Sequence, residues 1–409
     1  MTGSSTVSTQ SIWRTRARVA GAIVGVFLAG FFAFGIGAYA FTQFLGPLQA
    51  EFGWSRAVLG GLMTAFWTAA PFVLVAAYAL DHVGIRRMVF AGAVIEAGAL
   101  AWLTRAHLPA EFYAIRFLMG VGKCFTLTPL SVAIARWFPT RTGLVLGISL
   151  CGWHAGGMAL APFAAWLVGV HGWRSAALAL AALLVTGMAA ASFLMRDPGL
   201  QATDRGTQSR DPRAAPVAFA PIAVLVIVGI STLAYYAGYA GLLSQLSPML
   251  TDVGLGPLQV GNAMAAVAAF ALVGTILSGV TTQWLTPRQS GGVLLALMGA
   301  VEAGATLLHD GAGQGAVIGV VVLLGLLVGG GDPILIEVVR RTVPDRAFAR
   351  MYGLWYFVCL VGLAAAPLFA GALFDLYGDY RMAFLTLGAL TGVCAVAWIW
   401  RLAGIGKVA

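Results

Sequence analysis

Charged residues are scarce in this chain, and their scarcity is the first clue to its class. Asp, Glu, Lys and Arg make up 10% of the 409 residues, whereas apolar types make up 60%. An ordinary soluble domain has about 25% charged residues and roughly 45–50% apolar ones. Too few polar side chains are available to cover a compact soluble core. The composition therefore excludes a soluble enzyme, a secreted scaffold and a disordered chain, and it predicts a protein that crosses a membrane several times.

Cysteine is also scarce, and the pattern of the four residues excludes two kinds of site. Every cysteine lies in an apolar stretch, and none forms a C-x-x-C pair or a cluster with histidine, so we predict neither a disulfide framework nor a zinc centre. The polar segments contain no phosphate-binding loop, no metal-spaced His/Asp set and no Ser/His/Asp arrangement. We therefore expect a protein that is not an enzyme and that has no cofactor and no bound metal.

Long apolar runs dominate what is present. A helix needs about 20 mostly apolar residues to cross the hydrocarbon core. Twelve such runs occur, centred near residues 33, 68, 97, 123, 157, 184, 233, 270, 299, 327, 362 and 391. Backbone polar groups in a bilayer are satisfied only in helices or in a closed barrel, and the short alternating segments of a barrel are absent. The sequence predicts an all-α membrane protein with twelve transmembrane helices.

The distribution of Lys and Arg predicts the orientation of the chain. With the N-terminus inside, 18 of the 24 basic residues fall in inside segments, four fall in outside loops and two lie within an apolar run. Cytoplasmic loops are enriched in Lys and Arg. We therefore expect a monomeric multi-pass protein of the bacterial inner membrane with both termini cytoplasmic. This placement also accounts for the net charge of +9 without nucleic acid as a partner.

The two halves of the sequence resemble each other. Three pairs of short segments match at offsets of 206, 204 and 207 residues, and they contain Glu96 and Glu302, Pro129 and Pro333, and Arg174 and Arg381. A polar stretch rich in Arg, Asp, Pro and Gly separates the halves. We predict an N-terminal six-helix half over 1–195, a cytoplasmic linker over 196–216 and a C-terminal six-helix half over 217–409. Parallel repeats of this kind occur in transporters, with the substrate near the membrane midplane between them.

Several motifs resemble those of a known family. The turn Asp81-His-Val-Gly84-Ile-Arg86-Arg87 resembles the cytoplasmic Asp-Arg-x-Gly-Arg-Arg turn of the major facilitator superfamily, and Arg116-x-x-x-Gly-x-Gly resembles a second motif of that family. Segments at 51–56, 136–147 and 374–380 resemble its bacterial monocarboxylate-transporter and oxalate/formate-antiporter branch. The resemblance implies two rocking six-helix halves and a central cavity lined by the fourth, fifth and tenth helices. It also implies a gate at Asp81, Gly84, Arg86 and Arg87.

Ionisable residues within the predicted helices are the first candidates for function, because charge inside a bilayer is costly. Arg116 and Lys123 lie seven residues apart, hence on one face of the fourth helix and about 10 Å apart along its axis. His154 reaches a similar depth on the fifth helix, and Asp332 and Glu337 lie on the tenth. A cationic first half thus faces an acidic second half. We predict that Lys123, Arg116 and His154 bind a small carboxylate, and that Asp332 and Glu337 are proton-coupling residues.

Structural roles stay open for the same residues. Lys123 could pair with Asp332 or Glu96, and Arg116 could pair with Glu111 or Glu96. Further polar and aromatic residues in the predicted helices are candidates for substrate contacts: Tyr39, Gln43, Tyr235, Asn262, Trp355 and Tyr356.

Two further expectations concern the helices themselves. Asp332 follows three glycines and precedes Pro333, so we expect the helix to be loosened there. Glu96 and Glu302 are equivalent in the repeat, and such a symmetric pair favours an architectural role.

These residues, together with the resemblance, predict a secondary active transporter of small organic anions. The most specific form of the prediction is proton-coupled monocarboxylate uptake by alternating access, with an organic anion, protons and the lipid bilayer as partners. A second hypothesis is a proton-driven multidrug or metabolite exporter that uses Asp332 and Glu337 beside an aromatic cavity. A membrane-embedded enzyme or receptor is the third class.

Overall fold

The regular elements of the described chain are all helices, which confirms the predicted all-α class. A computed structural model describes residues 9–137, 142–195, 222–308, 313–342 and 345–401. The α-helices are α1 (Thr9–Phe34), α2 (Leu45–Phe52), α3 (Arg56–Thr68), α4 (Phe72–Val83), α5 (Ile85–Trp102), α6 (Pro109–Trp137), α7 (Thr142–Leu194), α8 (Ile222–Asp252), α9 (Pro257–Thr281), α10 (Pro287–Ala305), α11 (Gln314–Thr342), α12 (Asp345–Tyr377) and α13 (Arg381–Arg401). The short elements are a π-helix, η1 (Gly35–Tyr39), and two 3-10 helices, η2 (Ala40–Phe44) and η3 (Leu103–Arg105).

These helices are consistent with the twelve predicted membrane crossings. Nine described segments are long and apolar enough to span a bilayer. One of them, Cys151–Leu194, turns at Gly172, whose φ of 75° and ψ of 162° are not helical, so α7 supplies two crossings rather than one. The charged helices α6 and α10 supply the remaining two. The linker predicted over 196–216 lies outside the described residues and stays a prediction.

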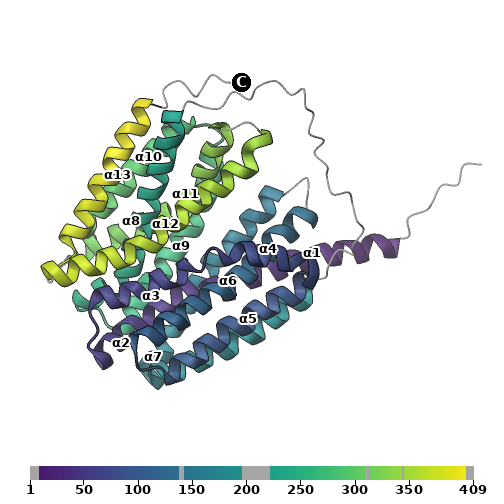
Figure 1. Cartoon of the computed structure of the whole chain (residues 1–409), viewed down its shortest axis with the longest axis horizontal. Coiled ribbons are helices and arrows are strands. Elements are labelled where there is room, and N and C mark those ends of the chain that lie inside the picture. The colour runs from purple at the N-terminus through teal and green to yellow at the C-terminus, as the bar shows by residue number, and fades with distance from the viewer. Residues whose placement is uncertain (1–8, 138–141, 196–221, 309–312, 343–344, 402–409) are drawn as a thin grey trace, which may run out of the picture.

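The helices pack into two groups that correspond to the two halves of the sequence (Figure 1). One apolar core is built by α1 to α7 and the other mainly by α8 to α13. The two groups meet where α3 packs against α12 and where α7 packs against α9, and in Figure 1 they diverge toward the opposite end. We call the end with residues 53–55, 253–256 and 378–380 the closed end, and the end where α4 meets α5 the open end.

Small residues allow the halves to approach closely at the closed end. Gly60 of α3 lies against the backbone of Pro367 in α12, where any side chain at position 60 would collide. One turn further along, the Thr64 hydroxyl donates a hydrogen bond to the Ala364 carbonyl at 2.5 Å. Because backbone meets backbone here, the two halves cross without bulky side chains between them.

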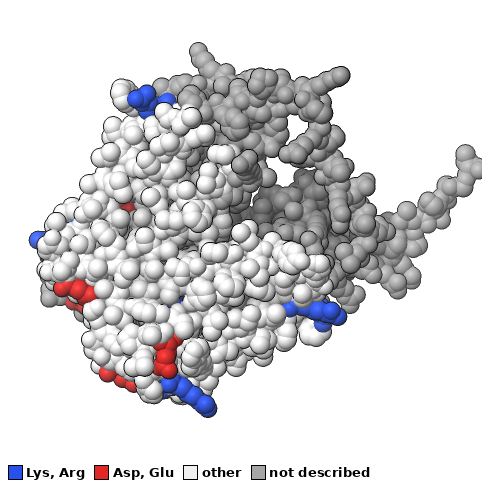
Figure 2. Space-filling view, viewed as in Figure 1, with Lys and Arg blue, Asp and Glu red and all other residues white. Residues whose placement is uncertain are grey.

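The outer surface agrees with a membrane location. In Figure 2 the described charged side chains gather near the ends of the molecule, and a broad face between them is uncharged. Large apolar side chains are exposed along the helices, among them Leu74 at 75%, Val396 at 70% and Ile276 at 58%. Such apolar exposure is what a lipid-facing surface requires.

The predicted gate turn has the backbone that its glycine permits. Gly84 ends α4 and precedes α5 with a φ of 84°, a conformation that residues with a side chain rarely adopt. Arg86 and Arg87 are exposed, and the Arg86 guanidinium lies 4.1 Å from the ring centre of Phe193. The side chain of Asp81 lies outside the described part of the structure.

The helix α11 continues through Pro333, and the loosening expected beside Asp332 is limited to one missing backbone hydrogen bond. Proline has no N–H to bond the carbonyl four residues earlier, here that of Gly329. The Thr275 hydroxyl of α9 lies 3.1 Å from this carbonyl and 2.9 Å from the Ala271 carbonyl of its own helix, so its one proton is shared between the two acceptors. A side chain of a neighbouring helix thus meets the freed group, and α11 stays continuous.

Candidate functional site

A cavity lies between the two halves, close to where α3 and α12 cross. The space between the atoms there, including the part open to solvent, is about 390 Å³. The N-terminal half contributes Ala38, Thr42, Met63, Phe66, Trp67 and Arg116, and the C-terminal half contributes Tyr239, Ala240, Leu243, Ser244, Leu363 and Pro367. Among these lining residues Arg116 alone is charged. The position between the halves is the one that the internal repeat predicts for a substrate site.

Arg116 borders this cavity but is itself fully buried. Its Nη1 donates to the Gly37 carbonyl at 3.0 Å and its Nε donates to the Leu62 carbonyl at 3.2 Å. The guanidinium also stacks on two rings, 3.8 Å from the centre of Phe41 and 4.5 Å from that of Phe66. These contacts fix the guanidinium plane, and no carboxylate of the described residues forms an ion pair with it.

The Gly37 carbonyl is available because the first crossing departs from α geometry at this point. The π-helix η1 and the 3-10 helix η2 replace regular i to i+4 bonding over residues 35–44. Such single π-turns are frequent at functional sites because they leave backbone groups free. Ala38 and Thr42, which line the cavity, come from this irregular segment. The sequence analysis did not anticipate it, and the only signal is the Gly35-Ile-Gly37 sequence.

Lys123 lies behind the cavity wall rather than in it. Its side chain is buried, and its Nζ stands 3.8 Å from the ring centre of Trp67 and 4.4 Å from that of Phe66. Both rings belong to residues that line the cavity. Neither an ion pair nor a hydrogen bond joins Lys123 to any residue in the described ranges. The pairing with Asp332 that the sequence left open is therefore not formed in this conformation.

Glu111, the other suggested partner of Arg116, is occupied at the outer surface of α6. Its Oε2 accepts hydrogen bonds from the backbone N–H groups of His107 at 2.8 Å and Leu108 at 2.9 Å. These two N–H groups hold the pKa of the Glu111 carboxyl below its usual value. Glu111 thus caps the start of its own helix and does not reach Arg116.

The structure brings together three other predicted residues of the N-terminal half. The Tyr39 hydroxyl and Nδ1 of His154 form a hydrogen bond of 3.2 Å, which joins the first crossing to α7. Gln43 donates from Nε2 to the Thr42 hydroxyl at 3.0 Å. Since Thr42 lines the cavity, its partner Gln43 lies directly behind the cavity lining.

A second polar group lies in the C-terminal half. The Tyr236 hydroxyl of α8 donates to Oδ1 of Asp332, which is half-buried on α11. The Tyr236 ring centre is 6.3 Å from that of the cavity-lining Tyr239 and 6.2 Å from that of Trp355. Trp355 in turn donates from Nε1 to the Thr232 hydroxyl at 3.0 Å. An aromatic cluster therefore connects the cavity with Asp332.

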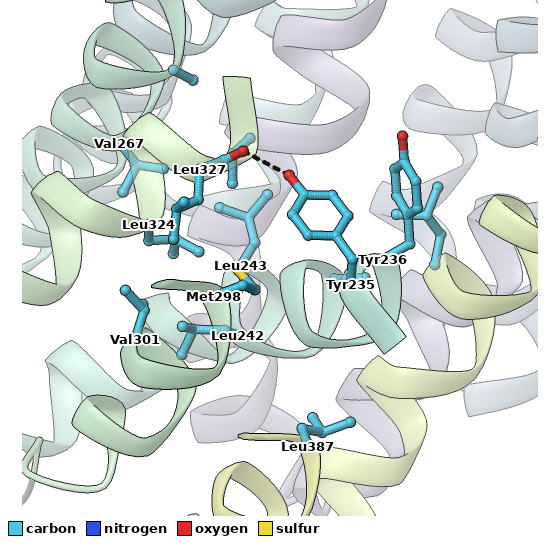
Figure 3. Packing of buried hydrophobic residues seen from close by; sticks show 14 of the residues in the cluster. Tyr235, Tyr236, Leu242, Leu243, Val267, Met298, Val301, Leu324, Leu327 and Leu387 are labelled. Atoms are coloured by element: carbon cyan, nitrogen blue, oxygen red, sulfur yellow. Dashed lines mark hydrogen bonds between the residues drawn. The ribbon is translucent and has the colours of Figure 1, made fainter. Parts of the chain in front are cut away.

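The neighbouring Tyr235 points the other way, into the core of the C-terminal half (Figure 3). Its hydroxyl donates to the Leu327 carbonyl of α11 at 2.6 Å, and it is 1% exposed. Figure 3 shows Tyr236 directed away from this bond. The structure thus separates two adjacent tyrosines, one in the packed core and the other beside Asp332.

Three further candidates lie away from the cavity lining. Asn262 and Tyr356 are exposed on α9 and α12. Glu337 forms ion pairs with Arg340 at 2.7 Å and with Arg341 at 2.6 Å, near the end of α11. A carboxylate held by two guanidinium groups is poorly suited to bind and release a proton.

The sequence analysis missed the polar contacts that join the halves at the closed end. Arg56 forms an ion pair with Asp252 of α8, with 2.6 Å between Nη2 and Oδ1. The backbone N–H groups of Arg56 and Ala57 each donate to an oxygen of Asp375 at 2.8 Å. A carboxylate of α12 thus caps the N-terminus of α3 in the other half. The available signal was that Arg56 and Asp375 both lie in segments resembling one transporter branch.

Two six-helix halves that enclose a charged cavity define the architecture of a secondary transporter. The family model described as Major Facilitator Superfamily matches residues 26–331 and 228–404. The chain belongs to the major facilitator superfamily, and it is accordingly a multi-pass membrane transporter and not an enzyme.

Curated relatives and solved structures agree with this assignment. Monocarboxylate transporter 13 of Rattus norvegicus is 27% identical over 331 residues, which cover 75% of this chain and 71% of the relative. Monocarboxylate transporter 11 of Homo sapiens is 25% identical over 365 residues, covering 85% and 72%. A bacterial homologue of the human lysosomal transporter Spinster, in an inward-facing and occupied conformation, has the same fold with a TM-score of 0.74, 17% identity, and coverage of 92% and 95%.

Proposed function

We propose that this transporter is a proton-coupled carrier of small monocarboxylates that works by alternating access. The observation that carries the proposal is the positive charge beside the inter-half cavity. Arg116 borders the cavity, Lys123 stands behind its aromatic wall, and neither is paired with a carboxylate of the described residues. Glu96 of α5 acts electrostatically on both cations, but two cations beside one acid still leave net positive charge, which is costly in a low-dielectric interior and favours an anion.

The lining of the cavity supports a small anion with an apolar body. Apart from Arg116 the lining residues are aliphatic, aromatic or hydroxylic. A single cationic group matches one carboxylate, whereas a second carboxylate would face apolar side chains without a partner. Phe66 and Trp67 add aromatic surface to the lining, which suits the apolar body of such a substrate. Relatives named monocarboxylate transporters, at 25–27% identity, favour the same substrate class.

The conformation supports the proposed cycle. If both termini are cytoplasmic, as the distribution of Lys and Arg predicts, the open end faces the cytoplasm of an inward-facing carrier in the bacterial inner membrane. A structural neighbour is described as inward-facing. The Arg56–Asp252 pair and the Asp375 cap then close the outer end, and they separate when the halves rock. We infer that Asp332 takes up and releases the coupling proton in this rocking step, with Tyr236 as its hydrogen-bond donor.

The alternative of a proton-driven exporter has less support. It requires acidic residues as the principal charges of the cavity, but Glu337 is held in two ion pairs and Asp332 does not line the cavity. A monomer is proposed because both halves of the cavity come from one chain.

The test is uptake of radiolabelled lactate by the purified protein in liposomes with an inward proton gradient. Arg116→Gln and Lys123→Gln should each lower uptake at low lactate concentration by roughly 10–100-fold, since an interaction with a charged group contributes about 1.5–3 kcal/mol. Arg105→Gln is the matched control, because Arg105 is an exposed residue of the same half. Normal uptake by both cavity variants would contradict the proposal.

A further inference from the structure

The proposed function leaves two buried carboxyl groups without a role, Glu96 of α5 and Glu302 of α10. Both side chains are fully buried. Within the described residues, neither oxygen of either group has a hydrogen-bond partner. Buried acids that serve only structure are normally held by direct hydrogen bonds. Even the partly exposed Glu337 near the end of α11 is held by Arg340 and Arg341. The absence of such bonds sets the two residues apart.

The two acids are packed in the same way in their own halves. Glu96 lies against Gly37 of the first crossing, where a Cβ atom would stand 2.8 Å from its Oε1. Glu302 lies still more closely against Gly238 of α8, the first helix of the second half. In each half a glycine therefore makes room for an acid. This equivalence makes one acid a matched control for the other.

The charges around the two acids differ. The helix α6 packs against α5 and brings Arg116 and Lys123 near enough to act electrostatically on Glu96. The other elements packed near Glu96, α7 and η1, add no further charged group to it in the described part of the chain. The groups that face Glu302 are Thr391 and Cys394 of α13 and Tyr235 of α8. None of these three is a cation.

One short backbone segment connects Glu96 with the anion site. The carboxyl group of Glu96 contacts Gly37, and the Gly37 carbonyl accepts the hydrogen bond from Nη1 of Arg116. The next residue, Ala38, lines the cavity. A change of charge at the cavity is thus felt at Glu96 through both the electrostatic field and the η1 backbone.

We propose that Glu96 is a proton-binding site linked to anion binding at Arg116, an inference that rests on the proposed anion transport. Burial opposes the charge on the Glu96 carboxyl group, whereas the two nearby cations favour it, so without a substrate the ionised form depends on these cations. An anion beside Arg116 supplies negative charge itself, so Glu96 binds one proton from the solvent and the charge of the site stays constant. Release of the anion reverses the step. One O–H bond forms on binding and breaks on release, and no other bond changes.

The experiment measures protons taken up per lactate bound, with a pH-indicator dye and the purified full chain in weak buffer. The wild type should take up one proton per anion, and its lactate affinity should fall by up to about tenfold per pH unit as pH rises above the titration of Glu96. Glu96→Gln should bind lactate without proton uptake and without this pH dependence. Glu96→Asp should retain the uptake, and Glu302→Gln should behave as the wild type.

Each contrary result has a distinct meaning. Undiminished proton uptake by Glu96→Gln, or an equal loss in Glu302→Gln, would overturn the role of Glu96. If Glu96→Gln melts as an unfolded protein, Glu96→Asp and Glu302→Gln decide: the pH at which proton uptake is lost must shift in Glu96→Asp and stay unchanged in Glu302→Gln, and any other result assigns the proton elsewhere. Failure of the wild type to bind any short monocarboxylate overturns the proposed function itself. Anion binding without proton uptake in the wild type overturns only the linkage.

Discussion

The two halves share one architecture but differ in where they carry charge. The N-terminal half holds Arg116 and Lys123 beside the cavity, whereas the C-terminal half holds Asp332 behind an aromatic cluster. At the closed end a cation of the first half and an acid of the second half are in contact, because Arg56 pairs with Asp252. Opposite charges are therefore joined where the halves touch and left apart at the cavity. This difference in charge pairing indicates that a charged substrate can bind at the cavity.

The largest test of this comparison concerns the glycines beneath the equivalent acids. Gly238→Ala should lower the free energy of unfolding by about 3 kcal/mol or more, and Gly37→Ala by about 1–3 kcal/mol, because the added methyl group meets the acid more closely in the second half. Thermal unfolding of the purified variants measures both. Adding Glu302→Ala should restore much of the loss in Gly238→Ala. Independent effects of these two changes would show that the acid and the glycine do not touch.

A smaller effect is expected from separating the charges at the closed end. Asp252→Asn removes the partner of the buried Arg56 side chain and should shift the equilibrium toward an open outer end by about 2 kcal/mol. Spin labels at the exposed positions Ser55 and Tyr377 report the distance across this end. The control is Arg174→Gln, which breaks an exposed pair with Glu51 inside one half and should change little. Equal effects would remove any special role for contacts between the halves.

The smallest effect concerns the tyrosine hydroxyl that each half directs at a titratable side chain. Tyr236→Phe removes a bond to the carboxyl group of Asp332 and should cost about 1.5 kcal/mol, whereas Tyr39→Phe removes a bond to His154 and should cost about 0.5–1 kcal/mol. Thermal unfolding at neutral pH compares the two variants. If Tyr236→Phe loses no more stability than Tyr39→Phe, the result would indicate that Asp332 holds its proton in this conformation.

Much of the fold was predictable because the bilayer imposes requirements, such as the length of an apolar run, that can be read directly along the sequence. Apolar length predicted the crossings, the repeat predicted two halves, and the motif around Gly84 predicted a turn, which lies between α4 and α5. The cavity between the halves also followed from the repeat. Arg116 was recognised because an arginine within an apolar helix is conspicuous in any sequence.

The finer geometry was not predictable, because it depends on which backbone groups meet in space. Spacing placed Lys123 and Arg116 on one face, but it could not show that Phe66 and Trp67 separate Lys123 from the cavity. A loosened helix was expected beside Pro333, but the sequence could not show that Thr275 of another helix would lie against the freed carbonyl. The π-turn at Gly37 was not predicted, because its only signal, the Gly35-Ile-Gly37 sequence, also occurs in regular membrane helices.

The Asp375 cap makes the stability of one helix depend on the state of the whole carrier. The first turn of α3 is complete only while a carboxylate of the opposite half accepts its two N–H groups. When the halves separate, water must take over both groups, so outer opening is also a hydration event. The order of the first turn of α3 and the access of solute to the outside therefore depend on the same conformational equilibrium.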